Sequence, residues 1–285
     1  MKKTQIALIA VIAVIVGYLF LQPVKGLVKP KEEKSNGMVA GAKPAEAAAN
    51  VSVEMISAAA KTAIGADLSA KIVDLEGQLK AATGTEKTKL QQELAKQWDD
   101  VAQPAPAAFY YMALAREGNR FDNWLKAGTR FNEAYRATQD SSIQGAMVLN
   151  AVEALQAATK LQPSNLDAKA GLGVAYVNGG SANPMDGISL LLGVVKEDPN
   201  NRVANFNLGM FSLKSGQFDK ALPRFNKVIE QDPSALEPYF YLAEAHKQLG
   251  QKKEAIAAYE KCKELMRNRP DFVERIDGFI KELKN

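Results

Sequence analysis

Residues 202–235 read RVANFNLGMFSLKSGQFDKALPRFNKVIEQDPSA, and residues 236–269 read LEPYFYLAEAHKQLGQKKEAIAAYEKCKELMRNR. Both stretches are 34 residues long, and their apolar residues follow a helical period of about 3.6 residues. Marker residues recur at the same offset of 34, namely Pro199 and Pro233, Leu208 and Leu242, Gly216 and Gly250, Ala221 and Ala255, and Phe225 and Tyr259. The recurring glycines stand where one helix would turn into the next. This stretch predicts repeated pairs of helices, one pair every 34 residues.

Residues 166–201 form a further copy of the pattern. The Leu172-Gly173 dipeptide lies 36 residues before the matching dipeptide at 208–209, whereas Leu191 lies 34 residues before Phe225. Two residues are therefore inserted near Ser181–Pro184, in the expected turn between the two helices.

Residues 121–165 form another copy, which is degenerate. It begins with Trp124, Ala127-Gly128 and Phe131, and it ends at Pro163. The copy is eleven residues longer than the regular 34. We therefore expect its first helix, or the turn after that helix, to be longer than in the other copies.

The order Leu-Gly-x2-Tyr, then Ala-x3-Phe, then Pro resembles the tetratricopeptide repeat (TPR) superfamily over residues 121–269. The resemblance implies an all-α fold, an α-solenoid of TPR helix pairs with about four repeats at 121–165, 166–201, 202–235 and 236–269. Residues 270–285 are expected to form an amphipathic capping helix, because the end of a repeat stack needs a polar outer face. Residues 51–120, outside the clear resemblance, are predicted to be a helical N-terminal region.

The resemblance also implies a partner-binding groove, because the first helix of each TPR repeat lines the concave face. Mapped onto this chain, that face comprises Ala170, Val174, Val177, Phe206, Met210, Leu213, Phe240, Tyr241, Glu244 and Lys247. The set is mostly apolar, and Phe206 and Met210 stand where some TPR domains use Lys and Asn to clamp a carboxylate. We therefore expect an apolar helix or strand of a protein partner as the ligand.

Exposure of this groove is a further expectation. Phe206, Met210 and Phe240 are predicted to face away from the second helix of their own repeat and to remain in water. The alternative is that residues 51–118, or a second copy of the chain, cover this face.

The N-terminus carries a predicted transmembrane signal-anchor. Residues 4–24 are uncharged and mostly apolar, long enough for a helix that spans the bilayer and contacts its lipids. No small-x-small cleavage site follows, although a cleaved signal peptide remains the alternative. Lys2 and Lys3 favour a cytoplasmic N-terminus. We therefore expect a single-pass protein of a bacterial inner (cytoplasmic) membrane, with residues 25–50 as a flexible linker and a periplasmic, extracytoplasmic body.

Composition excludes several classes of function. The chain has one histidine, His246, and one cysteine, Cys262, too few for a His/Cys zinc site or an intrachain disulfide. Both side chains are expected to pack inside the repeats. Residues 1–43 hold seven lysines against two glutamates, a charge of +5, so the remaining residues sum to −1 of the total of +4. Such a body does not favour nucleic acid.

These observations predict a membrane-anchored scaffold or adaptor, without catalytic residues, cofactor or metal, that acts in envelope assembly or maintenance. Two alternatives stay open. One is a structural homo-oligomer that uses the groove for self-association. The other is a ligand-binding or enzymatic subunit that works through residues 51–118.

Overall fold

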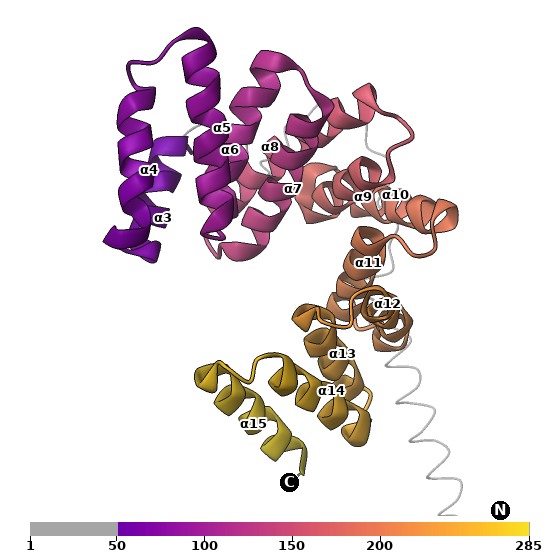
Figure 1. Ribbon diagram of the computed structural model, residues 1–285. Helices are drawn as coiled ribbons and strands as arrows, with labels where there is room; N and C mark the ends of the chain where they lie inside the picture. Colours follow the sequence, from indigo (N-terminus) through magenta and orange to yellow (C-terminus); the bar gives the residue numbers. More distant parts are fainter. Residues whose placement is uncertain (1–50, 285) are drawn as a thin grey trace, which may run out of the picture. The chain divides into compact units, whose positions relative to one another are not determined.

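The computed structural model describes residues 51–284, and these residues form helices without any β-strand (Figure 1). The helices are α3 (Val53–Ile64), α4 (Ala66–Leu79), α5 (Gly84–Asp100), α6 (Pro104–Gly118), α7 (Phe121–Ala137), α8 (Ser141–Leu161), α9 (Leu166–Ala175), α10 (Pro184–Glu197), α11 (Arg202–Lys214), α12 (Phe218–Gln231), α13 (Leu236–Gln248), α14 (Lys252–Leu265) and α15 (Pro270–Lys284), with the π-helical turn η1 (Tyr176–Gly180) after α9. The predicted all-α fold is confirmed for these residues.

The expected transmembrane segment and linker, residues 4–24 and 25–50, lie outside the described residues. Among the helices of residues 51–284, none combines the length and the apolar character needed to cross a bilayer.

The helices form a solenoid, because each one packs mainly against its neighbours in the chain (Figure 1). The pairs α7–α8, α9–α10, α11–α12 and α13–α14 fall within the four predicted repeats. Each pair also contacts the next, for example through α12 and α13. We call α7, α9, α11 and α13 the first helices of these pairs, and α8, α10, α12 and α14 the second helices.

Local sequence explains where the regular helices begin and turn. Asn201 accepts a hydrogen bond from the backbone N–H of Ala204 at 2.9 Å, which satisfies a free donor at the start of α11. Gly216 and Gly250 have φ angles of 74° and 71° in the turns that follow α11 and α13. Glycine adopts this left-handed conformation without the steric cost that a side chain brings.

The eleven additional residues of the first repeat lie in its helices. Helix α7 has 17 residues against 13 in α11, and α8 has 21 residues against 14 in α12. The expectation of a longer first helix is therefore confirmed, and the alternative of a longer turn is wrong, because only residues 138–140 separate α7 from α8. Asp140 caps α8 by accepting hydrogen bonds from the backbone N–H groups of Ser142 and Ile143, so the second helix starts early.

The two-residue insertion of the second repeat lies between α9 and α10, as the offsets predict. The chain widens into the π-helical turn η1, where Gly179 has a φ of 112°, and residues 181–183 then lead into α10. Asn183 caps α10 through the backbone N–H of Met185 at 3.0 Å. A wider turn accommodates extra residues without breaking the packing of the two helices.

The hydrophobic core follows the stack in three clusters of buried side chains. The first extends from α3 to α9, the second from α11 to α15, and a smaller third lies between them on α9, α10 and α11. Residues 51–118 belong to the first cluster, with α6 packed on α7 and α3 packed on α6. These helices extend the stack, and their main contacts do not include α11 or α13. The alternative in which residues 51–118 cover the first-helix face is therefore wrong.

Candidate protein-interaction groove

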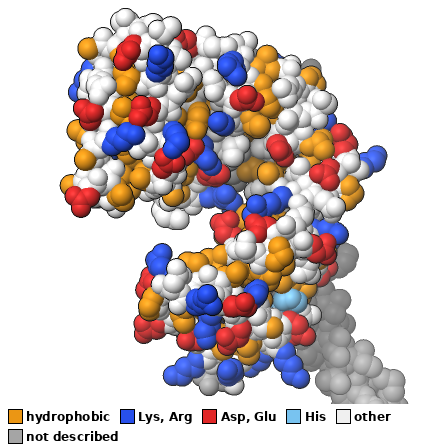
Figure 2. Space-filling model, in the orientation of Figure 1, with side chains coloured by type: hydrophobic (Ala, Val, Ile, Leu, Met, Phe, Trp, Pro, Cys, Tyr) orange, Lys and Arg blue, Asp and Glu red, His pale blue; other side chains and the backbone are white. Residues whose placement is uncertain are grey.

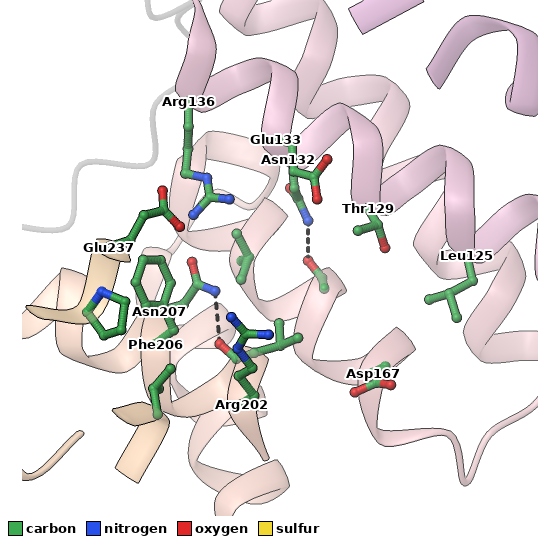
Figure 3. A pocket seen from close by; sticks show the side chains of 15 residues that line it. Leu125, Thr129, Asn132, Glu133, Arg136, Asp167, Arg202, Phe206, Asn207 and Glu237 are labelled. Atoms are coloured by element: carbon green, nitrogen blue, oxygen red, sulfur yellow. Dashed lines mark hydrogen bonds between the residues drawn. The ribbon is translucent and has the colours of Figure 1, made fainter. Parts of the chain in front are cut away.

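A groove of about 420 Å³ lies where the first helices α7, α9 and α11 meet the start of α13. We call it the first-helix groove (Figure 3). Its lining residues are Leu125, Thr129, Asn132, Glu133, Arg136, Asp167, Gly171, Val174, Arg202, Val203, Phe206, Asn207, Val228, Glu237 and Pro238. Arg136, Phe206 and Glu237 lie at one end in Figure 3, and Leu125 and Asp167 lie at the other. The groove therefore combines apolar contact with charged groups of both signs.

Asn132 joins two first helices beneath the groove. Its Nδ2 donates a hydrogen bond of 2.9 Å to the backbone oxygen of Gly171 on α9. The opposite atom of the amide, Oδ1, is buried and accepts no hydrogen bond from residues 51–284. The Gly171 carbonyl sets the orientation of the amide, because only the NH₂ group can donate to it.

Arg136 connects the first repeat to the third. Its guanidinium lies 5.7 Å from the ring centroid of Phe206, a distance at which a cation is attracted to an aromatic face. The pKa of Tyr241 is raised mainly by burial, with a further rise from Glu237 and an opposing effect of Arg136. Charges from α7 and α13 therefore act on the same end of the groove.

Neighbouring ion pairs neutralise part of this charge. Arg130 donates to Asp99 at 2.7 Å and to Glu133 at 2.8 Å, and Arg202 lies 3.3 Å from Asp232. Glu237 is exposed and makes no ion pair within 4.0 Å among residues 51–284. Glu237 and Arg136 are thus the charged side chains of this end of the groove that remain free for a ligand, as far as residues 51–284 show.

Of the ten residues that the sequence predicts for the groove, Val174 and Phe206 line it. Ala170 and Val174 belong to the buried cluster between α9 and α11. Met210, Leu213, Phe240 and Tyr241 are half-buried against the C-terminal cluster. Glu244 accepts a hydrogen bond from the hydroxyl of Tyr259, and Lys247 lies 5.6 Å from the ring centroid of Phe279. Val177 is half-buried in η1.

The predicted exposure of the large apolar side chains is wrong. Phe206 is only 9% exposed, and its ring centroid lies 6.1 Å from that of Phe225 on the second helix of its own repeat. Phe240 lies likewise 6.0 Å from Tyr259 of its own second helix. Gly209 leaves space into which the Phe225 ring extends, because a Cβ at that position would lie 2.8 Å from the ring. The aromatic rings therefore fill the interior of the C-terminal repeats.

Sequence reasoning missed the contribution of α7 and of the polar side chains. Thr129 and Arg136 belong to a repeat that diverges from the regular pattern, and Asn207 follows directly on Phe206. A helical-wheel projection of α11 that placed Val203 and Asn207 together, four residues apart, would have found this part of the groove.

Cys262 and His246 are the side chains that could in principle bind a metal or act as a nucleophile, and both make contacts within the repeats. Cys262 is fully buried, and burial raises its pKa to about 12, so the prediction that it packs inside the repeats is confirmed. His246 is instead half-buried, with its Nδ1 2.6 Å from Oε1 of Gln251 in the turn after α13. Residues 51–284 contain no group of three His, Cys, Asp or Glu side chains placed to hold a metal ion.

Comparison with known proteins bears on the fold rather than on the groove. A family model described as tetratricopeptide repeat matches residues 212–272. A thermophilic TPR protein from Thermus thermophilus is similar in structure, with a TM-score of 0.53 and 17% identity, over 67% of this chain and 97% of that chain. MamA from Desulfovibrio magneticus RS-1 is similar with a TM-score of 0.43 and 21% identity, over 66% of this chain and 99% of that chain. No curated protein sequence matches the chain. The family match thus identifies a tetratricopeptide repeat within residues 212–272, and the fold of the described residues is similar to that of a TPR protein.

Proposed function

We propose that this protein is a scaffold that holds a segment of a partner protein in the first-helix groove. The observation that carries the proposal is the groove of about 420 Å³ formed jointly by four first helices. Single helices do not create such a site, so its ligand would contact several repeats at once. This is how repeat solenoids obtain an extended binding surface.

The lining of the groove suggests an amphipathic ligand rather than the purely apolar one expected from the sequence. Val203 is 37% exposed and offers an apolar contact at the groove. Asn207, Arg136 and Glu237 offer hydrogen bonds and charges of both signs. A peptide segment that combines apolar side chains with polar groups would satisfy both parts, as interface cores surrounded by polar rims do.

The test is site-specific photocrosslinking in native membranes. A photoreactive amino acid at Asn207 is expected to capture a partner that mass spectrometry identifies. Val203→Arg, which places a long charged side chain in the groove, is expected to abolish the crosslink. Leu249→Arg is the matched control, because Leu249 is 38% exposed but lies outside the groove, and it should leave the crosslink intact.

Equal loss of the crosslink in both variants, with unchanged folding by circular dichroism, would reject the groove as the binding site. A crosslink only between two copies of the chain, with a dimer in light scattering, would favour the structural homo-oligomer instead.

We further propose that residues 4–24 anchor the scaffold in a bacterial inner membrane, with the repeats outside the cytoplasm and a role in envelope assembly or maintenance. The uncharged stretch, preceded by Lys2 and Lys3, supports this placement. Protease added to intact spheroplasts should digest the repeats while the full-length protein of untreated cells stays in the membrane fraction. Protection of the repeats would show that they lie on the cytoplasmic side. A soluble product that starts after about residue 22 would show that the apolar segment is a cleaved signal peptide rather than an anchor.

A further inference from the structure

A second pocket, of about 440 Å³, lies on the second helices of the solenoid, with a lining that differs in charge from the first-helix groove. Three cations of α12, Lys220, Arg224 and Lys227, line it together with Asn205 of α11. The apolar side chains of the pocket are Val195, Pro199 and Pro223. No acidic residue among those described contributes to this lining. We call this site the second-helix pocket.

Arg224 is held in place by a fully buried side chain. Its Nη1 donates to Oδ1 of Asn205 at 3.0 Å, and Asn205 has no exposed surface. The Asn205 amide is itself fixed, because its Nδ2 donates to the backbone oxygens of Pro199 and Asn201, both at 2.9 Å. A guanidinium has five N–H donors, and Asn205 occupies one of them. The remaining donors of Arg224 make no hydrogen bond within residues 51–284.

The three cations are only partly neutralised. Lys227 pairs with Glu230 at 2.9 Å, but both members of this pair are well exposed, so the pair contributes little. Lys220 donates to the neutral Gln217 at 2.7 Å. Neither Lys220 nor Arg224 has a carboxylate within 4.0 Å among the residues that the structure describes. Residues 220, 224 and 227 lie on one face of α12, where like charges repel.

An anionic ligand would relieve this repulsion. A carboxylate can accept two parallel hydrogen bonds from a guanidinium, and two lysines beside it add further charged donors. Val195, Pro199 and Pro223 form apolar walls beside these cations. The same walls would contact the methylene groups of an acidic side chain, which a free inorganic anion does not have.

We propose that the second-helix pocket binds an acidic peptide segment of a partner protein through its Asp and Glu carboxylates. Together with the first-helix groove, the chain would then hold two segments at separate sites, one on the first helices and one on the second.

The test uses the full-length protein and two fluorescent peptides, a blocked tetraglutamate and a blocked tetraglutamine, in anisotropy titrations at low ionic strength. Tetraglutamate is expected to bind with saturation, and tetraglutamine is not. The double variant Lys220→Gln, Lys227→Gln should weaken tetraglutamate binding roughly tenfold, because two charged donors are lost. The control variant Lys252→Gln, Lys253→Gln removes the same charge from exposed positions of α14 outside the pocket, and should change binding less than about twofold.

Three results would overturn the proposal. The first is the absence of saturable tetraglutamate binding to the wild-type protein. The second is an equal loss in the two double variants, which would indicate diffuse attraction to the positive charge of the whole chain. The third is displacement of the probe by inorganic phosphate at matched ionic strength as effectively as by unlabelled tetraglutamate, which would make this a site for free anions. Val203→Arg in the first-helix groove should leave tetraglutamate binding unchanged, so failure of one proposal does not decide the other.

Discussion

Two glycines of the same helix, α10, lie in different surroundings. A Cβ at Gly187 would meet first the backbone oxygen of Gly173 in α9, and it would lie 2.7 Å from Cγ2 and 2.8 Å from the backbone nitrogen of Val177 in η1. A Cβ at Gly193 would meet nothing within 4 Å. The close approach of α10 to α9 and η1 therefore depends on the absence of a side chain at 187 but not at 193.

We expect Gly187→Ala and Gly193→Ala to change stability in opposite directions. The first should lower the free energy of unfolding by about 1–3 kcal/mol, because backbone atoms must move to accept the methyl group. The second should raise it by up to about 1 kcal/mol, because alanine is the better helix former. Urea denaturation measures both values, and a stabilising Gly187→Ala would contradict the packing of α10 on η1.

Cys262 provides a residue-scale reporter of folding, because it is the one cysteine of the chain. It has no exposed surface, and its raised pKa of about 12 disfavours the reactive thiolate. In mildly alkaline solution, a thiol reagent should label the chain only after urea unfolding. Rapid stoichiometric labelling of the native protein would show that α14 does not pack as described.

At the scale of elements, α15 packs on the preceding helix α14, and its role as a capping helix stays a prediction. Ile276, Ile280 and Leu283 are buried on one face, and the ring centroid of Phe279 lies 5.6 Å from that of Tyr259. Most of the charged residues of α15 are exposed, and the surface seen in Figure 2 mixes Lys and Arg with Asp and Glu. This helix therefore covers apolar side chains of α13 and α14 while presenting a polar outer face.

Truncation of a buried side chain in α15 tests this role. Ile276→Ala should lower the free energy of unfolding by about 2–5 kcal/mol, because Ile276 is 1% exposed and its removal leaves a cavity. Lys281→Ala, an exposed position of the same helix, should stay within about 0.5 kcal/mol of the wild type. Similar stability of the two variants would mean that α15 does not contribute to the core.

At the scale of the whole molecule, the described helices contact mainly their neighbours, and the core divides into three clusters along the chain. In such a solenoid, stability is close to a sum of terms for each repeat and its interfaces. A local change should therefore loosen nearby repeats and leave distant ones protected.

Ala255→Leu tests this expectation. Ala255 of α14 is fully buried, so a larger side chain should cost about 1–3 kcal/mol. Hydrogen exchange followed by mass spectrometry should become faster in α13, α14 and α15, while α5 and α6 keep their protection. Uniformly faster exchange would indicate one cooperative unit. Unchanged exchange would show that the helical register assigned to Ala255 is wrong.

The helix pairs of the last three repeats could be predicted from the sequence because their causes are local. Turn glycines such as Gly216 and caps such as Asn201 act within a few residues. The length of α8 could not be predicted in this way. No helix-breaking residue marks where residues 141–147 join the regular second helix. Asp140, the cap at which α8 starts, lies in the degenerate repeat.

The sequence by itself thus determined the repeat period and the helices and turns of the last three repeats, since side-chain periodicity and backbone preference depend on near neighbours. Only the tertiary structure decided which side chains line the binding groove. Phe206 is covered by Phe225, by Tyr241 and by Arg136, and Arg136 precedes it by 70 residues. Their contact depends on how successive pairs rotate against one another, and a small rotation changes which face of a first helix meets water. The periodicity of a single helix does not contain that angle, because packing between repeats sets it.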